Sequence, residues 1–233
     1  MGKTLIFTAT YNEKDNIKKL IEKINSINID FDLLIIDDNS PDKTWEILKE
    51  LEKKNKNLKV IVRDNKSGLD TAHKKAFDYG KSNGYEKFIS MDADLSHDPA
   101  EIPKIIHELD KFPFVIGSRY MPGGKCEMAG FRLFLSILGN KIIKYFLNIN
   151  CNEFTTSYRG FNLLSLEKFD FNLINSKGYS FFMETVFRIN KLNYKIKEIP
   201  ITFKNRTQGK SKIPKIEMLR TLKNLVVLKY FDI

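Results

Sequence analysis

The first half of the chain alternates between short apolar runs and amphipathic stretches, and this alternation limits the possible folds more than any other feature. Each apolar run ends in a polar turn, which is typical of strands that alternate with helices along the chain. The alternation predicts the α/β class, with a mostly parallel sheet flanked by helices. Predicted strands cover 4–9, 32–36, 58–63, 87–91 and 114–117, and predicted helices cover 13–27, 43–54, 69–82 and 99–111.

The second half has a less regular pattern, with amphipathic helices predicted over 131–147, 180–192 and 214–230. Strands are predicted near 159–164 and over 196–203, and Pro200 indicates that the later strand lies at a sheet edge. A polar, basic loop over 204–212 precedes the last helix. We therefore expect one domain over 1–203, followed by a basic loop and a C-terminal amphipathic helix over 204–233.

The charge balance indicates anionic partners. The 39 Lys and Arg residues exceed the 29 Asp and Glu residues and give a net charge of +10, which suits nucleotides, phospholipid headgroups or phosphorylated substrates. A nucleic-acid-binding module is a second class, but we find no aromatic-rich recognition motif to support it. The first strand is not followed by G-x-G-x-x-G, which disfavours a dinucleotide-dependent oxidoreductase.

Two features predict a cytoplasmic protein. Cys126 and Cys151 are the only cysteines and lack metal-ligand spacing, as expected in a reducing compartment. The N-terminus does not show the ordered regions of a signal peptide. The most apolar stretch, 131–149, contains Arg132, Lys141 and Lys144, and we do not expect it to cross a membrane.

Pairs of acidic residues follow two of the predicted strands. Asp37 and Asp38 follow one strand, and Asp92 and Asp94 follow another. Ligands of open parallel sheets bind beyond the carboxyl ends of the strands, so both pairs should face one cleft. Aspartate is also common in turns and helix caps, which is the alternative for a lone D-x-D. In a strongly basic chain the cluster favours a divalent cation that bridges a diphosphate.

Other polar residues have equally simple structural interpretations. Tyr11 can be an aromatic at a strand end, Asn39 to Asp42 a turn that needs no ligand, and Arg119 a surface residue. The basic loop over 204–212 can be a solvated segment. His73 and His107 are predicted to be exposed on helices, and His97 to be a turn residue or a support for the acidic site.

Four motifs of the first half occur in a characteristic order. They are Tyr11-Asn12-Glu13, Asp37-Asp38-Asn39-Ser40-Pro41-Asp42, the run from Met91 to Pro99, and Gly117-Ser118-Arg119-Tyr120. Later come the segments 155–159, 177–179 with Glu184, 198–201, Arg206 and 209–212. In order and spacing these motifs resemble the polyprenol-phosphate (dolichol-phosphate) mannosyltransferases, which are GT-A fold, family 2 glycosyltransferases. The resemblance implies a GT-A, Rossmann-like fold with amphipathic interface helices.

The resemblance also implies roles for individual residues. Asp92, Asp94 and Arg119 would be the catalytic residues, and Asp94 would bind the metal, Mg or Mn. The acceptor phosphate would lie at Arg119, Arg132 and Ser136. The donor would be held by Ala9, Tyr11, Glu13, Ile36 and Asp38 at the nucleoside, and by Asp92, Ala93, Asp94, Arg119, Arg206 and Lys212 at the diphosphate.

The activity implied is transfer of mannose from GDP-mannose to a polyprenyl phosphate with inversion. A UDP-sugar donor, or a glycan hydroxyl as acceptor, is a near alternative, and the hydroxyl would need a carboxylate base. The chain departs from the family pattern at four positions. Ala9 replaces proline, Lys43 and Asp70 replace glycine, and Glu153 replaces aspartate.

Membrane contact is expected from two helices. The apolar face of 131–147 suits either a membrane interface or packing on the sheet, and both remain open. The helix over 214–230 carries Lys215, Arg220, Lys223 and Lys229 beside leucines, which favours an anionic membrane surface. We expect peripheral attachment to the cytoplasmic face, alone or with a membrane subunit. The loop with Arg206 and Lys212 is expected to close over the bound donor as a lid.

Overall fold

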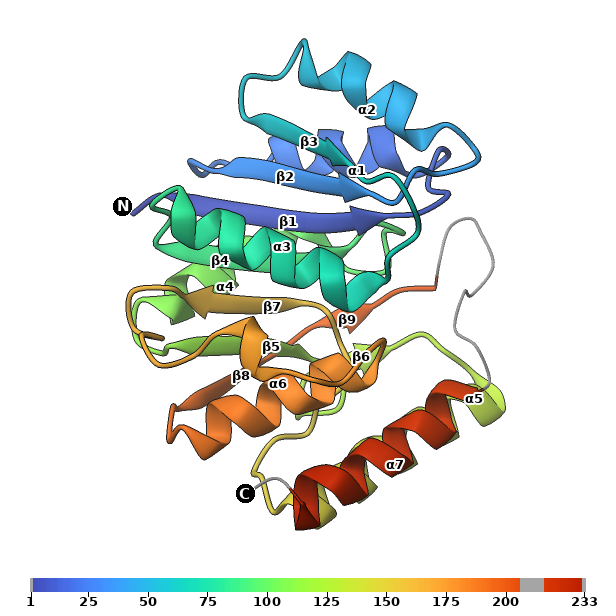
Figure 1. Ribbon diagram of the computed structural model, residues 1–233, viewed down its shortest axis with the longest axis vertical. Helices are drawn as coiled ribbons and strands as arrows, with labels where there is room; N and C mark the ends of the chain where they lie inside the picture. Colours follow the sequence, from blue (N-terminus) through green and yellow to red (C-terminus); the bar gives the residue numbers. More distant parts are fainter. Residues whose placement is uncertain (1, 206–215, 232–233) are drawn as a thin grey trace.

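The computed structural model describes residues 2–205 and 216–231 and shows a central sheet between two layers of helices (Figure 1). The seven strands have the order β3-β2-β1-β4-β7-β5-β8, and only β7 runs antiparallel to its neighbours. The predicted α/β class with a mostly parallel sheet is therefore confirmed. The strands are β1 (Thr4–Thr10), β2 (Asp32–Asp37), β3 (Leu58–Val62), β4 (Lys87–Asp92), β5 (Phe114–Ser118), β7 (Arg159–Asn162) and β8 (Ile196–Pro200).

Helices cover both faces of the sheet because successive strand residues point to opposite sides. Phe7 of β1 packs into the layer with α3, whereas its neighbour Ile6 packs into the layer with α1. One layer contains α1 (Ile17–Asn25), α2 (Thr44–Glu52) and α4 (Ile102–Leu109). The other contains α3 (Leu69–Ser82), α5 (Gly130–Leu147), α6 (Ser180–Lys191) and α7 (Ile216–Tyr230).

The strand order places a crossover point beside β1. The chain adds β2 and β3 on one side of β1 and then returns to add β4 on the other. Ala9 near the end of β1 pairs with Ile36 of β2 and with Asp92 of β4. Open α/β sheets bind ligands at such a point, so the two acidic segments flank the expected crevice.

The antiparallel strand β7 brings another segment to the same edge. Since β7 pairs antiparallel with β4, it starts near the carboxyl end of β4, and Arg159 pairs with Ser90. The residues immediately before it, 153–158, therefore lie beside the acidic turn that follows β4.

Some predicted elements differ from the structure. The strand expected over 196–203 is divided at Ile201 into β8 and a short strand β9 (Thr202–Phe203). β9 pairs with β6 (Lys125–Cys126) in a separate sheet of two strands, which we had not predicted. The edge position expected from Pro200 is confirmed, because β8 ends the large sheet. Short 3-10 turns occur at η1 (Pro99–Glu101), which precedes α4, and at η2 (Phe171–Leu173).

His73 was wrongly expected to be exposed. It lies on α3 with only 2% of its surface accessible, against the rings of Phe7, Phe181 and Phe182. Burial, with a smaller effect from the charge of Arg159, lowers the pKa of His73 to about 3. His73 is therefore a neutral part of the core, while His107 is exposed as predicted.

The helices α5 and α7 contact each other and lie together below the sheet (Figure 1). The inner side of α5 is buried at Asn140, Ile143 and Leu147. Large apolar side chains remain exposed on both helices, including Phe131 at 73% and Tyr145 at 85%. In the described residues, no helix combines the length and the apolar character needed to cross a membrane.

Candidate active site

The turns after β1 and β2 are joined by hydrogen bonds. The backbone N–H of Asn12 donates to Ser40 Oγ at 2.9 Å, and that of Glu13 donates to Thr44 Oγ1 at 3.0 Å. The buried carboxylate of Asp37 accepts bonds from Thr10 Oγ1 at 2.7 Å and from the backbone and hydroxyl of Ser40. Asp37 therefore fixes the turn rather than facing the cleft, so only Asp38 of that pair remains a ligand candidate.

Asp38 is held in place by residues of the segment that follows β3. Its carboxylate is paired with Arg63 and also accepts the backbone N–H of Ser67 at 3.2 Å. In the same loop the ammonium of Lys66 lies 4.1 Å from the ring centre of Tyr11. These contacts bring the expected nucleoside residues Tyr11 and Asp38 to one end of the crevice. Ala9 and Glu13 are half-buried nearby in the chain, and Ile36 is fully buried.

The D-x-D segment turns sharply after β4. Asp92 Oδ1 accepts the hydroxyl of Ser157 at 2.5 Å, while 35% of its side chain stays exposed. Asp94 Oδ1 accepts the backbone N–H of Ser96 at 3.0 Å and its hydroxyl at 2.5 Å. Ala93, between them, is buried. Each carboxylate is thus oriented by a serine, and Ser157 was not found from the sequence because it is distant along the chain.

His97 supports the D-x-D segment from inside the protein. It is 1% exposed, its Nδ1 accepts the backbone N–H of Asp92 at 3.1 Å, and its Nε2 lies 3.2 Å from Thr156 Oγ1. Burial lowers the pKa of His97, although the charge of Asp92 opposes this effect. Nδ1 must be unprotonated to accept, so the neutral ring donates from Nε2 to Thr156. The supporting role is one of the two that we predicted for His97.

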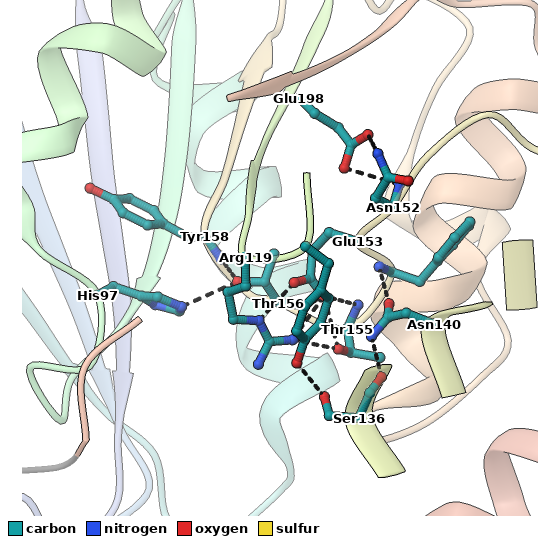
Figure 2. A network of polar contacts seen from close by, with 12 residues as sticks. His97, Arg119, Ser136, Asn140, Asn152, Glu153, Thr155, Thr156, Tyr158 and Glu198 are labelled. Carbon is teal, nitrogen blue, oxygen red and sulfur yellow. Dashed lines mark hydrogen bonds and ion pairs between the residues drawn. The ribbon is translucent and has the colours of Figure 1, made fainter. Parts of the chain in front are cut away.

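Arg119 and Glu153 form a buried ion pair (Figure 2). Arg119 donates from Nε and Nη2 to the two carboxylate oxygens at 2.7 and 2.8 Å, and from Nη2 to Thr155 Oγ1 at 2.9 Å. Burial alone would raise the pKa of Glu153, but the charge and hydrogen bonds of Arg119 outweigh it and lower the pKa. Arg119 is therefore not a surface residue, which was the alternative interpretation. Most of its charge is balanced by Glu153 within the protein.

Arg159 organises the loop that carries Glu153. Its guanidinium is 1% exposed and donates to the carbonyls of Thr156 at 2.8 Å, Phe154 at 2.9 Å and Phe182 at 2.7 Å. A buried arginine bonded to three carbonyls fixes the path of the backbone before β7. Arg159 ends the segment 155–159 that resembles the family, but this role was not predicted from the sequence.

The helix α5 is connected to the same network (Figure 2). Ser136 accepts the hydroxyl of Tyr120 at 2.7 Å, and Asn140 Oδ1 accepts the backbone N–H of Phe154 at 2.7 Å. Arg132 is exposed on α5, one helical turn before Ser136. The proposed acceptor residues Arg119, Arg132 and Ser136 therefore belong to one region. Arg206 and Lys212, and with them the expected lid, lie outside the described residues.

A divalent cation fits the chemistry of this edge. Within residues 2–205 and 216–231, no three His, Cys, Asp or Glu side chains gather into a metal-binding group. Mg²⁺ is commonly held by one or two carboxylates together with substrate phosphates, so a complete protein cage is not needed. Asp94, fixed by Ser96, and the partly exposed Asp92 are suitable hard oxygen ligands.

Besides Glu153, two more of the four departures from the family pattern, Lys43 and Asp70, now have a structural description. Lys43 has φ = 64°, the left-handed region that favours glycine. Asp70 Oδ1 accepts the backbone N–H of Gly178 at 3.1 Å, which connects the start of α3 to the loop before α6.

The chain is similar to several known proteins. It is 34% identical over 214 residues to polyprenol monophosphomannose synthase of Mycolicibacterium smegmatis, covering 91% of this chain and 81% of the relative. It is 32% identical over 212 residues to undecaprenyl-phosphate mannosyltransferase of Micrococcus luteus, covering 91% and 87%. Dolichol-phosphate mannosyltransferase of Pyrococcus furiosus is 33% identical over 214 residues, which cover 91% of this chain but 59% of that longer protein.

Solved structures support the fold. Glucosyl-3-phosphoglycerate synthase of Mycobacterium tuberculosis, in complex with Mn²⁺, UDP and phosphoglyceric acid, superposes with a TM-score of 0.66 and 13% identity over 97% of this chain and 77% of that chain. A mannosyltransferase of Pyrobaculum calidifontis, in complex with GDP-Man and Mn²⁺, has a TM-score of 0.58 and 15% identity over 85% and 55%. At this identity the likeness concerns the GT-A fold alone.

The profile of glycosyl transferase family 2 matches residues 5–169, which include the strands β1 to β7 and both acidic segments. The relatives extend the likeness to most of the chain. The chain therefore belongs to glycosyl transferase family 2 and is a glycosyltransferase.

Proposed function

We propose that this enzyme transfers mannose from GDP-mannose to a polyprenyl phosphate with inversion, giving polyprenyl-phosphate-mannose. The names of three relatives, each at least 32% identical, describe polyprenol, undecaprenyl or dolichol phosphate mannose transfer. The crevice beside β1 offers an anchored carboxylate for the nucleoside, Asp38, and a D-x-D segment for a diphosphate.

The pairing of Glu153 with Arg119 is the observation that carries the choice of acceptor. A hydroxyl acceptor needs a general base, and Glu153 is the buried acid of the region proposed for the acceptor. Its two oxygens accept from Arg119, and its pKa is lowered, which makes it a poor proton acceptor. A phosphate monoester loses its second proton near pH ~6, so it reaches the site already as an anionic nucleophile. The arrangement therefore suits a phosphate acceptor.

In the proposed reaction an acceptor phosphate oxygen attacks the anomeric carbon of mannose. The new carbon–oxygen bond forms on the face opposite to GDP, while the bond from that carbon to the diphosphate oxygen breaks and its electrons leave with GDP. This displacement inverts the anomeric configuration. Ser157 and Ser96 hold Asp92 and Asp94 in fixed orientations, which limits the reorganisation needed as charge develops.

Mg or Mn, held by Asp94 with Asp92 beside it, would neutralise charge on the departing diphosphate. We assign the acceptor phosphate to Arg132, Ser136 and the partly balanced Arg119. We propose Arg206 and Lys212 as further contacts of the donor phosphates.

We further propose that the enzyme works at the cytoplasmic face of a membrane, as a peripheral protein. Exposed Phe131 and Phe134 on α5, Tyr230 on α7 and Phe231 directly after it suit the interfacial region of a bilayer. The enzyme has to reach its polyprenyl acceptor at the bilayer surface, whether it attaches alone or with a membrane subunit.

The experiment is a transfer assay with a panel of GDP- and UDP-sugars, a polyprenyl phosphate, and Mg²⁺ or Mn²⁺. We expect a mannolipid only with GDP-mannose and with either metal, and its anomeric configuration should be inverted relative to the donor. Product formed from a UDP-sugar instead would show that the donor is not GDP-mannose. Transfer to a polyprenol that lacks phosphate would refute the proposed phosphate acceptor.

A further inference from the structure

A basic groove lies between α6 and α7, away from the D-x-D segment. Its volume is about 770 Å³. The described residues that line it include four cationic side chains, Lys177, Arg188, Arg220 and Lys223, and one acid, Glu184. We define these residues with Val227 and Phe231 as the α6/α7 groove.

Glu184 does not offset most of this charge. Its Oε1 accepts from Arg188 Nε at 3.1 Å and Nη2 at 2.9 Å, and its Oε2 accepts the backbone N–H of Ser176 at 2.8 Å. The carboxylate is 2% exposed, so its charge is directed toward Arg188 and the loop before α6. Lys177 and Lys223 are exposed and contribute two further positive charges at the rim, beside the exposed side chain of Arg220.

The α7 side of the groove has both cationic and apolar parts. Arg220, Asn224 and Val227 are spaced by four and three residues, so they share one face of the helix. Phe231 directly follows the helix, and its backbone N–H donates to the carbonyl of Val227 at 2.9 Å, which continues this row. Arg220 lies at the beginning of this row, whereas Val227 and Phe231 at its end are 42% and 73% exposed. A ligand with an anionic group and an apolar chain matches this order.

The groove also adjoins the apolar surface proposed to meet the membrane. Leu222, Val226 and Tyr230 on the same helix are exposed, as are Phe131 and Phe134 on the neighbouring α5. A headgroup in the groove would therefore belong to a lipid whose chains reach that surface. Separate phosphate groups in solution would use the cations but leave the apolar end of the groove uncovered.

We propose that the α6/α7 groove binds the headgroup of an anionic phospholipid and so fixes the enzyme on the bilayer at a site distinct from both substrates. The inference rests on the proposed function for its membrane setting. It assigns a saturable lipid site to the groove, which differs from a diffuse attraction between a basic protein and an anionic surface.

The test uses the full chain and a short-chain, water-soluble phosphatidylglycerol below its micelle-forming concentration. Calorimetric titration of the wild type should give saturable binding of one lipid per protein. The double variant Arg220→Gln/Lys223→Gln should bind at least tenfold more weakly. The matched control, Lys141→Gln/Lys229→Gln, removes two exposed cations of α5 and α7 outside the groove and should bind as the wild type does.

Three results would overturn the proposal. They are a lack of saturable binding, an equal loss in both double variants, and binding of inorganic phosphate as tight as that of the lipid, which would indicate a free-phosphate site. Thermal unfolding of both variants, followed by circular dichroism, checks that each is folded. The titration contains no donor or acceptor, so a protein that binds the lipid but transfers no mannose would refute the proposed function and leave the groove site standing.

Discussion

Glu153 and Arg119 are joined by two hydrogen bonds of 2.7 and 2.8 Å in a region from which water is excluded, with the carboxylate 0% and the guanidinium 7% exposed at their side chains. Burying two charges is costly, and it is offset only when geometry and further hydrogen bonds are favourable. Here Thr155 and Thr156 donate three additional bonds to Glu153 Oε1. The pair therefore joins β5 to the loop before β7.

Replacement of Glu153 by Gln should destabilise the protein at neutral pH. The variant leaves the buried Arg119 without its counter-charge, which typically reduces the free energy of unfolding by about 3 kcal/mol or more. Urea unfolding at pH 7 measures the loss. Lys104→Gln, which breaks the exposed pair with Glu101, is the control and should cost less than about 1 kcal/mol.

The same variant predicts a change in acid stability. The folded pKa of Glu153 is lowered from 4.5, so its stabilising contribution is present above that value and is lost as the pH falls through the folded pKa. The difference in unfolding free energy between wild type and Glu153→Gln should therefore shrink below pH 4.5. A difference that is constant with pH would contradict the lowered pKa.

Asp94→Asn should nearly abolish transfer while preserving the fold. The amide keeps the shape of the side chain and can still accept from Ser96, but it removes the charge proposed to hold the metal. We expect a loss of at least about 10³-fold in kcat/KM, and GDP binding that no longer responds to Mn²⁺. Asp37→Asn is a useful comparison, since that carboxylate is fully buried and bonded to Thr10 and Ser40. Asp37→Asn should lower the free energy of unfolding and leave most of the response of GDP binding to Mn²⁺ in place.

His73→Phe should remove part of the acid sensitivity of the fold. The folded pKa of about 3 lies below the usual value of 6.5, so the unfolded chain takes up a proton that the folded chain does not. His73 therefore stabilises the fold fully above pH 6.5, and this contribution falls by about 1.4 kcal/mol per pH unit between 6.5 and 3. Urea unfolding from pH 7 to 4.5 should give a shallower decline in the variant. Equal slopes in both proteins would indicate that His73 is protonated in the folded state.

Phe131→Ser/Phe134→Ser should weaken binding to vesicles, including uncharged phosphatidylcholine vesicles. Both rings are exposed on α5, at 73% and 57%, and a buried Phe side chain contributes about 1.5–3 kcal/mol. We expect a reduction of tenfold or more in the partition coefficient, measured by vesicle sedimentation. Leu164→Ser/Leu173→Ser removes two similarly exposed apolar side chains elsewhere on the surface and should leave binding unchanged.

The parallel strands β1, β2, β4 and β5 could be predicted from the sequence because each is rich in apolar residues and buried along most of its length. The pair β6 and β9 could not, because strands of two residues are too short to show a period. His73 was misplaced because a polar side chain within a helix normally faces solvent, whereas here three phenylalanines from distant segments enclose it.

At the candidate site, the D-x-D segment and Arg119 were recognisable from local motifs. The contacts that orient them were not. Glu153 and the segment that contains Ser157 were noticed as parts of the family pattern, but they reach the site only when β7 inserts antiparallel beside β4. Lys43 is an intermediate case. Its place at a position where the family prefers glycine was noted from the sequence, and the left-handed φ of 64° explains that preference, although the conformation itself was not predicted.

The insertion of β7 between β4 and β5 also constrains the order of folding during synthesis. The strands β3, β2, β1 and β4 come from residues 4–92 and can pair as soon as that segment is available. β5 is made next, but its partners in the sheet are β7, which ends at Asn162, and the still later β8. Until the ribosome has released about seventy further residues, β4 is an unpaired edge, a known liability for aggregation. The nascent chain is therefore most prone to aggregation after β1 to β4 have paired and before β5 and β7 can join them.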